Sequence, residues 1–550
     1  MTGKRADACA DMVFKNGRVL TVDAEDRVVE AAGVKGNRIV FAGADTEAEA
    51  FIGPGTKVFD LSGRSLLPGF IDTHFHPILT GLFGDDPEAA IIFTGQRNCK
   101  SIEDILNLVR KAAARRQRGQ WISMMGYDQN KVAEKRHVTR EELDQAAPHN
   151  PVQCMRGCGH VSVYNSLALA SIGVETAADA AKYPPNEIVL EGDRLTGIVK
   201  DHTHFLIWSR VDYSEEQQVR ALERSNDLLL RNGITSIHDP GECGKTSYRI
   251  MSRYCRQRKF KSRTYMMLHS IYGKPFSQAL VDHFLALGLE SGIGDDYFRL
   301  GTCKFMLDGG TSGPSCATRE PYSHDPKLPG ILGWEREETA AYIAKINEAL
   351  CQCSAHAVGD LAVEFMVEGY EKAFQRLPRP EARHRIEHCT LTDQDLIRRM
   401  AKMNICPSCN PGFITVNGSN YTRYYGKRMR YFTALRSMID AGIRVSISSD
   451  APSGPVEPAA LLDGCVNRID RLTGEAVDRN EAITLMEAVR LYTYNGAYGS
   501  YEEDRKGSIE VGKLADLTVL SEDLTSLPPE RISELRVELT MIDGEIEFEQ

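Results

Sequence analysis

The sequence predicts an α/β protein: a (β/α)8 TIM barrel with a small composite β-sandwich domain from both termini and an insertion capping the barrel mouth. Three features of the chain predict this architecture. Strand-like apolar runs alternate with amphipathic helical segments through the middle of the chain, which is typical of a parallel sheet covered by helices. Both ends are rich in short strands and glycine turns. An irregular, aromatic-rich stretch interrupts the alternation.

The two ends, 1–67 and 500–550, are expected to build the β-sandwich domain together. The run 13–22 is rich in β-branched residues and is interrupted by Asn16-Gly17, a strong hairpin signal. Further short strands are expected at 37–42, 57–61, 514–520 and 538–542, with a second turn of this kind at Asp543-Gly544.

The middle of the chain, 68–499, is expected to form the barrel, interrupted by an insertion at about 85–230. Its apolar strand-like runs include 235–239, 303–307 and 444–448. Its amphipathic helices include 217–232, 337–350, 362–374 and 393–403. Strand–helix alternation over this length is most economically an eight-stranded barrel.

Composition excludes several classes of protein. The 550 residues hold 66 Lys and Arg against 76 Asp and Glu, a net charge of −10, so the protein offers no positive field to nucleic acid. No window approaches the roughly 18 uncharged apolar residues of a membrane helix. The segment 1–16 lacks a signal-peptide pattern, and 14 cysteines are too few for a disulfide scaffold. We expect a cytoplasmic globular protein with reduced cysteines and with neither nucleic-acid nor membrane partners.

A pair of histidines is the sharpest chemical signal. His74 and His76 follow the turn and strand-like run Pro68-Gly-Phe-Ile71. Residues at i and i+2 of an extended chain face the same way, so both imidazoles can reach one cation. The alternative is two ordinary histidines at a strand end, because H-x-H also arises by chance.

Further metal-binding residue types follow later strand-like runs. They are Lys304, His356, His388 and Asp450, each near the end of such a run. In a barrel these positions meet at the C-terminal face, where barrel enzymes collect their chemistry. Histidines with a carboxylate are the ligands of a hydrolytic Zn²⁺.

These motifs, in this order, resemble the amidohydrolase superfamily over nearly the whole chain. Within it the sequence is similar to the amidohydrolase-3 group of N-substituted formamide deformylases and related metal-dependent hydrolases. The motifs that carry the resemblance are Gly69-Phe-Ile-Asp-Thr-His-Phe-His76, Lys304 with Asp308-Gly-Gly310, His356-Ala-Val-Gly-Asp360, Arg385-Ile-Glu-His388, Ser449-Asp-Ala-Pro452 and Gly507-Ser-Ile-Glu-Val-Gly-Lys-Leu-Ala-Asp516.

The resemblance implies one or two Zn²⁺ ions. His74, His76 and Asp450 would hold one ion, and His356 and His388 the other, with Lys304 carrying CO₂ as a bridging carbamate. A carbamate is an anionic oxygen ligand, whereas a free ammonium is a poor ligand. The alternative is that Lys304 is an ordinary cation paired with Asp308, in which case one metal is expected.

The expected mechanism is hydrolysis by zinc-activated hydroxide. Zn²⁺ lowers the pKa of bound water toward about 7. Asp450 is expected to orient that water, take its proton and pass it to the leaving amine. A metal ion would polarise the substrate carbonyl and stabilise the oxyanion.

Substrate contacts are expected from His160, Tyr127, Trp121 and Asp308. His160 lies in Cys158-Gly-His160, similar to a family motif whose histidine faces the substrate, which implies a carbonyl ligand or oxyanion donor. The alternative is a buried structural histidine. Tyr127 and Trp121 would line an apolar pocket, although core packing also explains aromatic residues. The family often has an acidic residue after Thr-Gly near 200, where this chain has Lys200.

Three other signals are weaker. His202-Thr-His204 repeats H-x-H without the preceding strand. His238-Asp239 ends the expected third barrel strand, where it either orients a ligand or caps structure. Cys406-Pro-Ser-Cys409, expected just after the seventh strand, lacks the second cysteine pair of a zinc ribbon.

The predicted function is hydrolysis of a non-peptide carbon–nitrogen bond, the amide of an N-substituted formamide or of a small N-acyl amine. Alternatives on the same site are a cyclic amide, carbamate or ester hydrolase, or a heterocycle deaminase. A metal-dead binding protein on the same fold is the alternative from another class. The partner is a small-molecule substrate, and the resemblance favours a homodimer.

Overall fold

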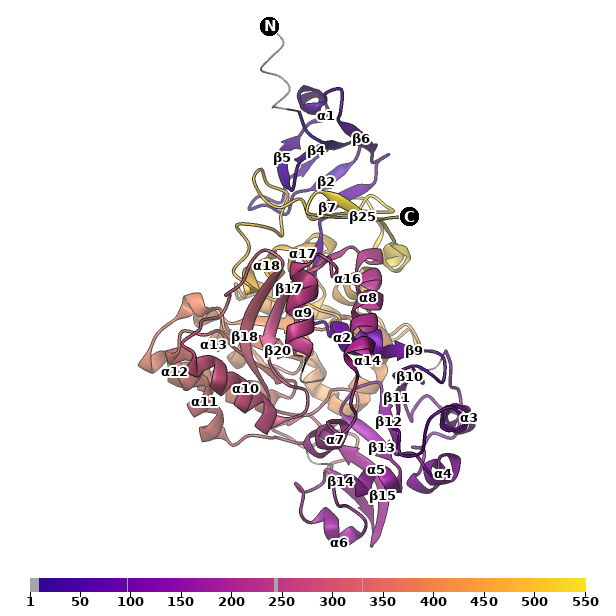
Figure 1. The fold of residues 1–550 in the computed structure, drawn as a ribbon. Helices are drawn as coiled ribbons and strands as arrows, with labels where there is room; N and C mark the ends of the chain where they lie inside the picture. Colours follow the sequence, from indigo (N-terminus) through magenta and orange to yellow (C-terminus); the bar gives the residue numbers. More distant parts are fainter. Residues whose placement is uncertain (1–8, 96, 242–245, 329) are drawn as a thin grey trace.

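The computed structural model describes residues 9–95, 97–241, 246–328 and 330–550. Within these ranges the strands form four sheets. Residues 1–8, half of the segment in which no export signal is expected, lie outside the described residues. In Figure 1 the strands of the two chain ends lie at the top, the barrel lies in the centre, and β9 to β15 lie at the lower right.

The central sheet is the predicted barrel. Its strands are β8 (Phe70–Asp72), β16 (Ile234–Asp239), β17 (Arg263–Leu268), β18 (Phe298–Met306), β19 (Cys353–Ala357), β20 (Arg385–His388), β21 (Cys406–Cys409) and β22 (Ser446–Ile447), paired in this order. Neighbouring strands are parallel throughout. Thr73 Oγ1 donates to Ile447 O at 3.1 Å and Asp450 N donates to His74 O at 2.9 Å, which ties the last strand to the first. The predicted fold class is confirmed.

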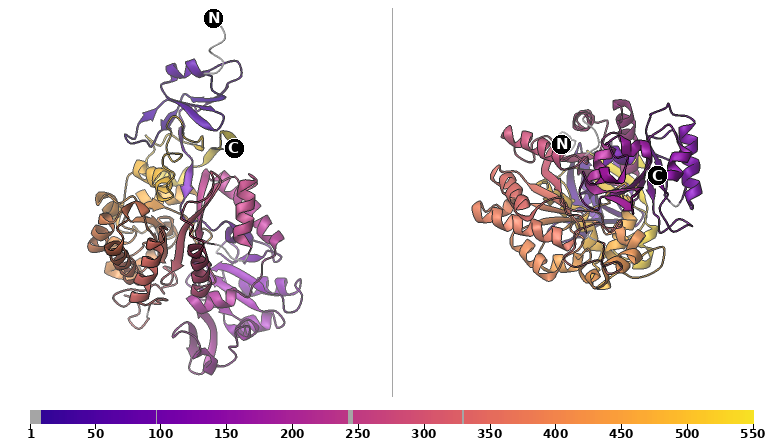
Figure 2. Two further views of the ribbon diagram at one scale, coloured as in Figure 1. Left: turned by 60° about the vertical axis from the view of Figure 1, so that its left-hand side comes forward. Right: turned by 90° about the horizontal axis from the view of Figure 1, so that it is seen from below.

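Helices cover the outside of this sheet (Figure 2). They include α2 (Pro77–Leu82), α8 (Glu215–Arg231), α9 (Ser247–Arg256), α10 (Lys274–Ala286), α11 (Arg336–Glu348), α12 (Asp360–Arg376), α13 (Gln394–Lys402), α14 (Gly412–Tyr425), α15 (Leu435–Asp440), α16 (Pro458–Val466), α17 (Leu485–Leu491) and α18 (Tyr494–Gly499). Helix α8 shows why the sequence predicts them well. Ser214 caps its N-terminus in a capping box with Gln217, and its apolar face is buried.

The strand order corrects two details of the sequence reading. His238 and Asp239 end the second barrel strand, not the third, because β16 pairs directly with β8. Cys406 and Cys409 lie on the seventh strand itself, β21, rather than after it.

Helix α8 packs against α2 in the helical layer of the barrel, so the inserted segment ends before α8.

Two sheets built from the chain ends pack together above the barrel. The first contains β5 (Arg38–Gly43), β4 (Ala31–Lys35), β1 (Met12–Lys15) and β6 (Lys57–Asp60). The second contains β25 (Glu545–Glu549), β24 (Val537–Ile542), β23 (Leu517–Leu520), β7 (Ser65–Pro68), β2 (Arg18–Leu20) and β3 (Val28–Val29), so it joins strands from both termini. Buried side chains of both sheets, such as Phe14 and Leu539, share one apolar cluster.

The two turn signals have different outcomes. Asp543-Gly544 joins β24 and β25 as an antiparallel hairpin, with both residues at positive φ. Asn16-Gly17 does not make a hairpin, because β1 and β2 belong to different sheets and the chain crosses between them there. Asn16 has φ 60°, and a side chain on Gly17 would meet Leu61 Cβ at 2.4 Å, so close approach rather than strand pairing requires glycine.

Seven strands between β8 and β16 form a separate mixed sheet. They are β14 (Ile188–Glu191), β15 (Arg194–Lys200), β13 (Val161–Tyr164), β12 (Val152–Arg156), β11 (Ile122–Tyr127), β10 (Ile91–Phe93) and β9 (Phe83–Gly84). The helices α3 (Ile102–Ala113), α4 (Arg140–Ala146), α5 (Ser166–Ala170), α6 (Ala177–Ala180) and α7 (Asp201–Trp208) accompany this sheet. Its loops reach the C-terminal ends of the barrel strands, as Gly313 shows by its close approach to Arg156.

A buried ion pair connects the barrel to the second terminal sheet. Arg263 on β17 donates from Nε to Asp516 Oδ2 at 2.6 Å and from Nη2 to Asp543 Oδ1 at 3.0 Å. We expect Arg263→Met to lower the free energy of unfolding by about 3–5 kcal/mol, because it leaves Asp516 buried without its cation. Urea unfolding measures the effect, and Arg256→Met, whose side chain is 66% exposed, is the control. An equal effect of both substitutions would contradict this role.

No helix within the described ranges is long and apolar enough to cross a membrane. The cysteines in the same ranges are free thiols, and most of them are buried.

Candidate metal centre and active site

Three of the predicted ligands converge at the C-terminal end of the barrel. His74 and His76 follow β8, and Asp450 follows β22. Asp450 Oδ1 lies 3.5 Å from His74 Nε2 and 3.7 Å from His76 Nε2. One ligand atom from each of the three residues lies within 4.8 Å of the others. This spacing suits a single metal ion between them.

Hydrogen bonds at the Nδ1 atom of each ring orient His74 and His76. His74 Nδ1 donates to Glu387 Oε2 at 2.8 Å, and His76 Nδ1 donates to Gly241 O at 2.9 Å. Both rings therefore carry the proton on Nδ1 and present an Nε2 lone pair. A metal-binding histidine is oriented in this way by a carboxylate or carbonyl. The protein supplies this orientation from its own side chains and backbone.

The second predicted ligand group, His356 and His388, lies directly beside the first group. The His388 ring centroid is 4.7 Å from that of His74 and 4.5 Å from that of His356. His388 Nδ1 donates to Asn410 Oδ1 at 2.7 Å, and His356 Nε2 donates to Gly309 O at 3.2 Å. Each ring thus keeps one nitrogen available as a ligand. Lys304 Nζ lies 3.4 Å from His74 Nε2, so all six predicted ligands come together.

The backbone at two of these positions is in the left-handed region. His388 has φ 70° and Asp450 has φ 54°. Such conformations are uncommon for residues with side chains and cluster at functional sites, where the surrounding structure imposes them.

Burial controls the protonation of the centre. It lowers the pKa of His76 to about 3 and that of His388 to about 4, with the charge of Lys304 acting in the same direction. These imidazoles are neutral at pH 7, as metal ligands must be. Burial also lowers the pKa of Lys304 to about 8, although Glu387 and Asp450 oppose the shift. Burial raises the pKa of Asp450 to about 8 against the charge of Lys304, and a metal ion bound beside it would favour the ionised carboxylate.

A chain of buried polar groups supports the first histidine from behind. Arg385 donates to both carboxylate oxygens of Glu387, at 2.8 and 3.0 Å. The same guanidinium donates to His238 Nδ1 at 2.7 Å and to Thr73 O at 2.9 Å. His238 is therefore connected to His74 by hydrogen bonds through Arg385 and Glu387. Sequence reasoning quoted Glu387 within the motif 385–388 but assigned it no role.

Two cavities that share lining residues lie at the centre. The inner cavity, of about 70 Å³, is lined by His74, His76 and Lys304, among others. The outer cavity, of about 320 Å³, lies between the inserted sheet and the barrel loops. His160, His356, His388 and Asp450 line both cavities. A substrate in the outer cavity can therefore reach the ligand cluster.

His160 faces this junction and has a carboxylate partner that sequence reasoning missed. Its Nδ1 donates to Asp201 Oδ1 at 2.8 Å, and Asp201 N donates back to His160 O at 2.8 Å. Asp201 is 1% exposed and has φ 44°. The resemblance implies an acidic residue near position 200, where this chain has Lys200. Asp201 stands one residue later, at the start of α7.

We expect Asp201→Asn to lower kcat/KM by about 10–100-fold without loss of bound metal. The neutral amide holds the ring of His160 less firmly than the carboxylate, and partners that orient a reacting group typically contribute at this level. Steady-state kinetics with metal analysis tests it, and Asp193→Asn, on an exposed turn, is the control. Unchanged kinetics would make the pair structural only.

The structure places three of the predicted substrate contacts, Tyr127, Trp121 and Asp308, outside the linings of both cavities. Tyr127 is buried with its hydroxyl on His137 Nδ1 at 2.8 Å, whereas its strand neighbours Gly126 and Asp128 line the outer cavity. Successive residues of an extended chain point to opposite faces, so the side chain of Tyr127 points away from the cavity that Gly126 and Asp128 line. Trp121 packs against the apolar clusters of the barrel and the inserted sheet.

Asp308 is a structural anchor. Its carboxylate accepts from the backbone N–H groups of Val358, Gly359 and Ala317 at 2.8 to 3.0 Å. It is 1% exposed, and burial raises its pKa to about 8. These contacts hold the loops after β18 and β19. The same hydrogen bonds occupy the carboxylate oxygens that an ion pair between Lys304 and Asp308 would need.

The second H-x-H lies on α7, where residues two apart diverge around the helix. His202 Nδ1 donates to Glu187 Oε1 at 2.9 Å, and His204 Nδ1 lies 2.7 Å from the hydroxyl of Tyr164. The two rings serve separate structural contacts.

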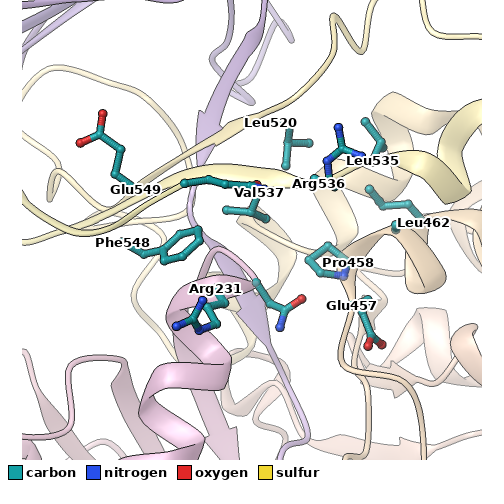
Figure 3. Close-up of a pocket in the computed structure, with 13 residues that line it drawn as sticks. Arg231, Glu457, Pro458, Leu462, Leu520, Leu535, Arg536, Val537, Phe548 and Glu549 are labelled. Carbon is teal, nitrogen blue, oxygen red and sulfur yellow. The ribbon is translucent and has the colours of Figure 1, made fainter.

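Another open cavity, of about 430 Å³, lies at the opposite end of the barrel (Figure 3). Arg231, which ends α8 just before β16 begins, lies beside Phe548 of the C-terminal strand there. The N-terminal ends of barrel strands are where residues usually serve stability.

A TIM barrel that gathers histidines and a carboxylate at the C-terminal ends of its strands defines a metal-dependent hydrolase. The chain belongs to the Amidohydrolase family, whose model matches residues 57–548. It therefore acts on carbon–nitrogen bonds.

Similar proteins span nearly the same length. The N-substituted formamide deformylase of Arthrobacter pascens is 27% identical over 98% of this chain and 98% of its own. Protein LONG AFTER FAR-RED 3 of Arabidopsis thaliana is 24% identical over 94% of this chain and 88% of its own. A solved structure of an uncharacterized metal-dependent hydrolase from Pyrococcus horikoshii OT3 covers 94% of this chain and 99% of its own, with TM-score 0.73 and 22% identity, which supports the fold.

Proposed function

We propose that this protein is a zinc-dependent amidohydrolase that cleaves the amide bond of an N-substituted formamide or another small N-acyl amine. The observation that carries the proposal is the convergence of His74, His76 and Asp450 with both imidazoles oriented by bonds at Nδ1. The similarity to the N-substituted formamide deformylase of Arthrobacter pascens supports the substrate class.

The residues fit one or two divalent ions. His74, His76 and Asp450 would hold the first, and His356 Nδ1 and His388 Nε2 are the ring nitrogens left for a second by the bonds to Gly309 and Asn410. Neutral imidazoles and a carboxylate are the ligand types that zinc prefers. When bound, Zn²⁺ supplies a Lewis acid for the carbonyl and lowers the pKa of a coordinated water.

Lys304 is suited to form the predicted carbamate. Only the neutral amine can add CO₂, and a pKa lowered by burial to about 8 leaves an appreciable fraction of that form near neutral pH. A carbamate would place an anion between the two histidine groups. The negative charge would also remove the repulsion between an ammonium and metal ions.

Asp450 and His160 would handle the proton and the developing charge. Asp450 lies at the junction of the two cavities, where it can take a proton from the attacking water and deliver it to the amine nitrogen as the C–N bond breaks. His160, held at Nδ1 by Asp201, has Nε2 left for the substrate oxygen. The products are the carboxylate of the acyl group and the free amine.

The decisive experiment measures primary-amine release from N-substituted formamides, small amides and lactams. It uses zinc-loaded protein, with Asp450→Asn as the blank. Release by the wild-type protein alone supports the proposal and identifies the acyl class. If the zinc-bound protein releases no amine from any of these compounds, the proposed amide hydrolysis is overturned in favour of ester, carbamate or deaminase chemistry. Stoichiometric zinc also distinguishes an enzyme from a metal-free binding protein.

The compartment, the partner and the assembly of the protein are also part of the proposal. We infer action in the cytoplasm on a small molecule, and a homodimer as the assembled form. Sedimentation of the purified protein tests the assembly.

A further inference from the structure

The outer cavity carries a charge pattern that the metal centre does not use. Three charged side chains line it on the side of the inserted sheet: Asp128, Lys131 and Arg156. They come from the ends of β11 and β12 and from the loop after β11. The charges of these three side chains influence which substrates can bind in the cavity.

Arg156 and Asp128 form a fixed pair. Arg156 is 3% exposed and donates from Nη2 to Asp128 Oδ1 at 3.2 Å and from Nη1 to Ser312 O at 3.2 Å. Burial raises the pKa of Asp128, but the charges of Arg156 and Lys131 and the N–H of Asn130 outweigh it and lower the pKa overall. Asp128 is therefore ionised, and its charge is shared by two cations.

Lys131 is the cation left over. Its Nζ donates to Val416 O on α14 at 3.1 Å, and it is half-buried. Among the described residues no carboxylate forms an ion pair with it. Two cations facing one carboxylate leave the cavity wall with one excess positive charge. A half-buried ammonium held by a neutral carbonyl gains most from a ligand that brings a negative charge.

The remaining wall is largely apolar. Phe93, Phe413 and Val416 also line the cavity, with Val416 next to Lys131. A ligand that fills the cavity thus meets predicted metal ligands, apolar side chains and an excess cation within one space.

We propose that the outer cavity selects amides whose apolar arm ends in a carboxylate, which Lys131 binds beside the Asp128–Arg156 pair. This inference rests on the proposed amidohydrolase function and narrows its substrate class. The scissile carbonyl lies at the metal centre, the methylene arm lies against the aromatic walls, and the carboxylate neutralises the ammonium.

The test compares N-formyl derivatives of unbranched ω-amino acids of increasing chain length with the N-formyl alkylamines of matching length. The wild-type protein is expected to show kcat/KM at least about tenfold higher for the carboxylates at the best length, the usual scale of a charge-assisted contact. Lys131→Met is expected to lower the carboxylate-to-neutral ratio about tenfold. An unchanged ratio in this variant, or a wild-type preference for the neutral amides, overturns the proposal.

Lys135→Met is the matched control. Lys135 lies on the same loop and donates to a backbone carbonyl, Asn130 O at 2.7 Å, but it is exposed and outside the cavity lining. Its substitution is expected to leave the ratio unchanged. Zinc content is measured in every variant, so that loss of the metal is not mistaken for loss of selectivity.

Failure of the proposed function gives a different result. If no amide of either series is cleaved, calorimetry measures binding of the same N-formyl-ω-amino acids to the wild-type protein and to Lys131→Met. Binding weakened about tenfold by the substitution supports the anion site without the hydrolytic activity. Binding that is absent, or equal in both proteins because the carboxylate binds the metal, overturns the site.

Discussion

Replacement of Asp450 by Asn is expected to lower kcat by about 10²–10⁴-fold, the range that positioned acid–base groups contribute. The carboxylate lies between His74 and His76 at the junction of both cavities, at 3.5 and 3.7 Å from their Nε2 atoms. An amide cannot carry a proton from water to the leaving amine. Amine release and metal content, measured together, report the two roles of this residue separately.

Much of the metal should remain in Asp450→Asn, because the histidines keep their orientation through Glu387 and Gly241. Asp440→Asn is the control: this aspartate ends α15 with its side chain 65% exposed. A wild-type rate in Asp450→Asn would disprove the proton role. Complete loss of metal would instead make Asp450 chiefly a ligand.

Replacement of Glu387 by Gln is expected to weaken metal binding about 10–100-fold, the usual effect of removing the partner of a metal-binding histidine. The carboxylate receives His74 Nδ1 and two nitrogens of Arg385, all buried. The substitution also leaves that guanidinium without its counter-charge. We therefore expect the free energy of unfolding to fall by about 3–5 kcal/mol.

Competition with a metal-binding dye measures the affinity, and urea unfolding measures the stability. Glu381→Gln, in the short 3₁₀ helix Pro380–Ala382 before β20 with its side chain 70% exposed, is the control for both. Glu387→Asp should recover part of the stability but less of the metal affinity, because the shorter chain keeps the charge and misplaces the oxygen. Unchanged metal affinity in Glu387→Gln would show that the backbone alone orients His74.

The barrel and its ligand residues were predictable because their signals are local. Alternating apolar runs and capped amphipathic helices depend on neighbours in sequence, as Ser214 and Gln217 illustrate at α8. Parallel strands of a barrel all deliver their C-terminal ends to one face. Residues that follow the strands, such as His74 and Asp450, must therefore come close, although nearly four hundred positions separate them.

Side-chain partners were less predictable where the choice lay between two faces or two distant segments. Tyr127 and Asp128 are adjacent on one strand end, and only the register of β11 decides which of them faces the cavity. Asn16-Gly17 has the composition of a hairpin turn, yet long-range pairing sends β1 and β2 into separate sheets. Asp201 has no sequence motif that connects it to His160.

The sequence by itself determined the order of strands and helices, the residue types that can bind a metal, and their positions at strand ends, because each depends on spacing along a short segment. Only the tertiary structure decided that Glu387 orients His74, that Asp201 holds His160 and that Asp308 anchors loops. It also decided that Lys131 lines the outer cavity without a carboxylate ion-pair partner among the described residues. These roles depend on which distant backbones pack together, and burial then decides which charged groups find a partner.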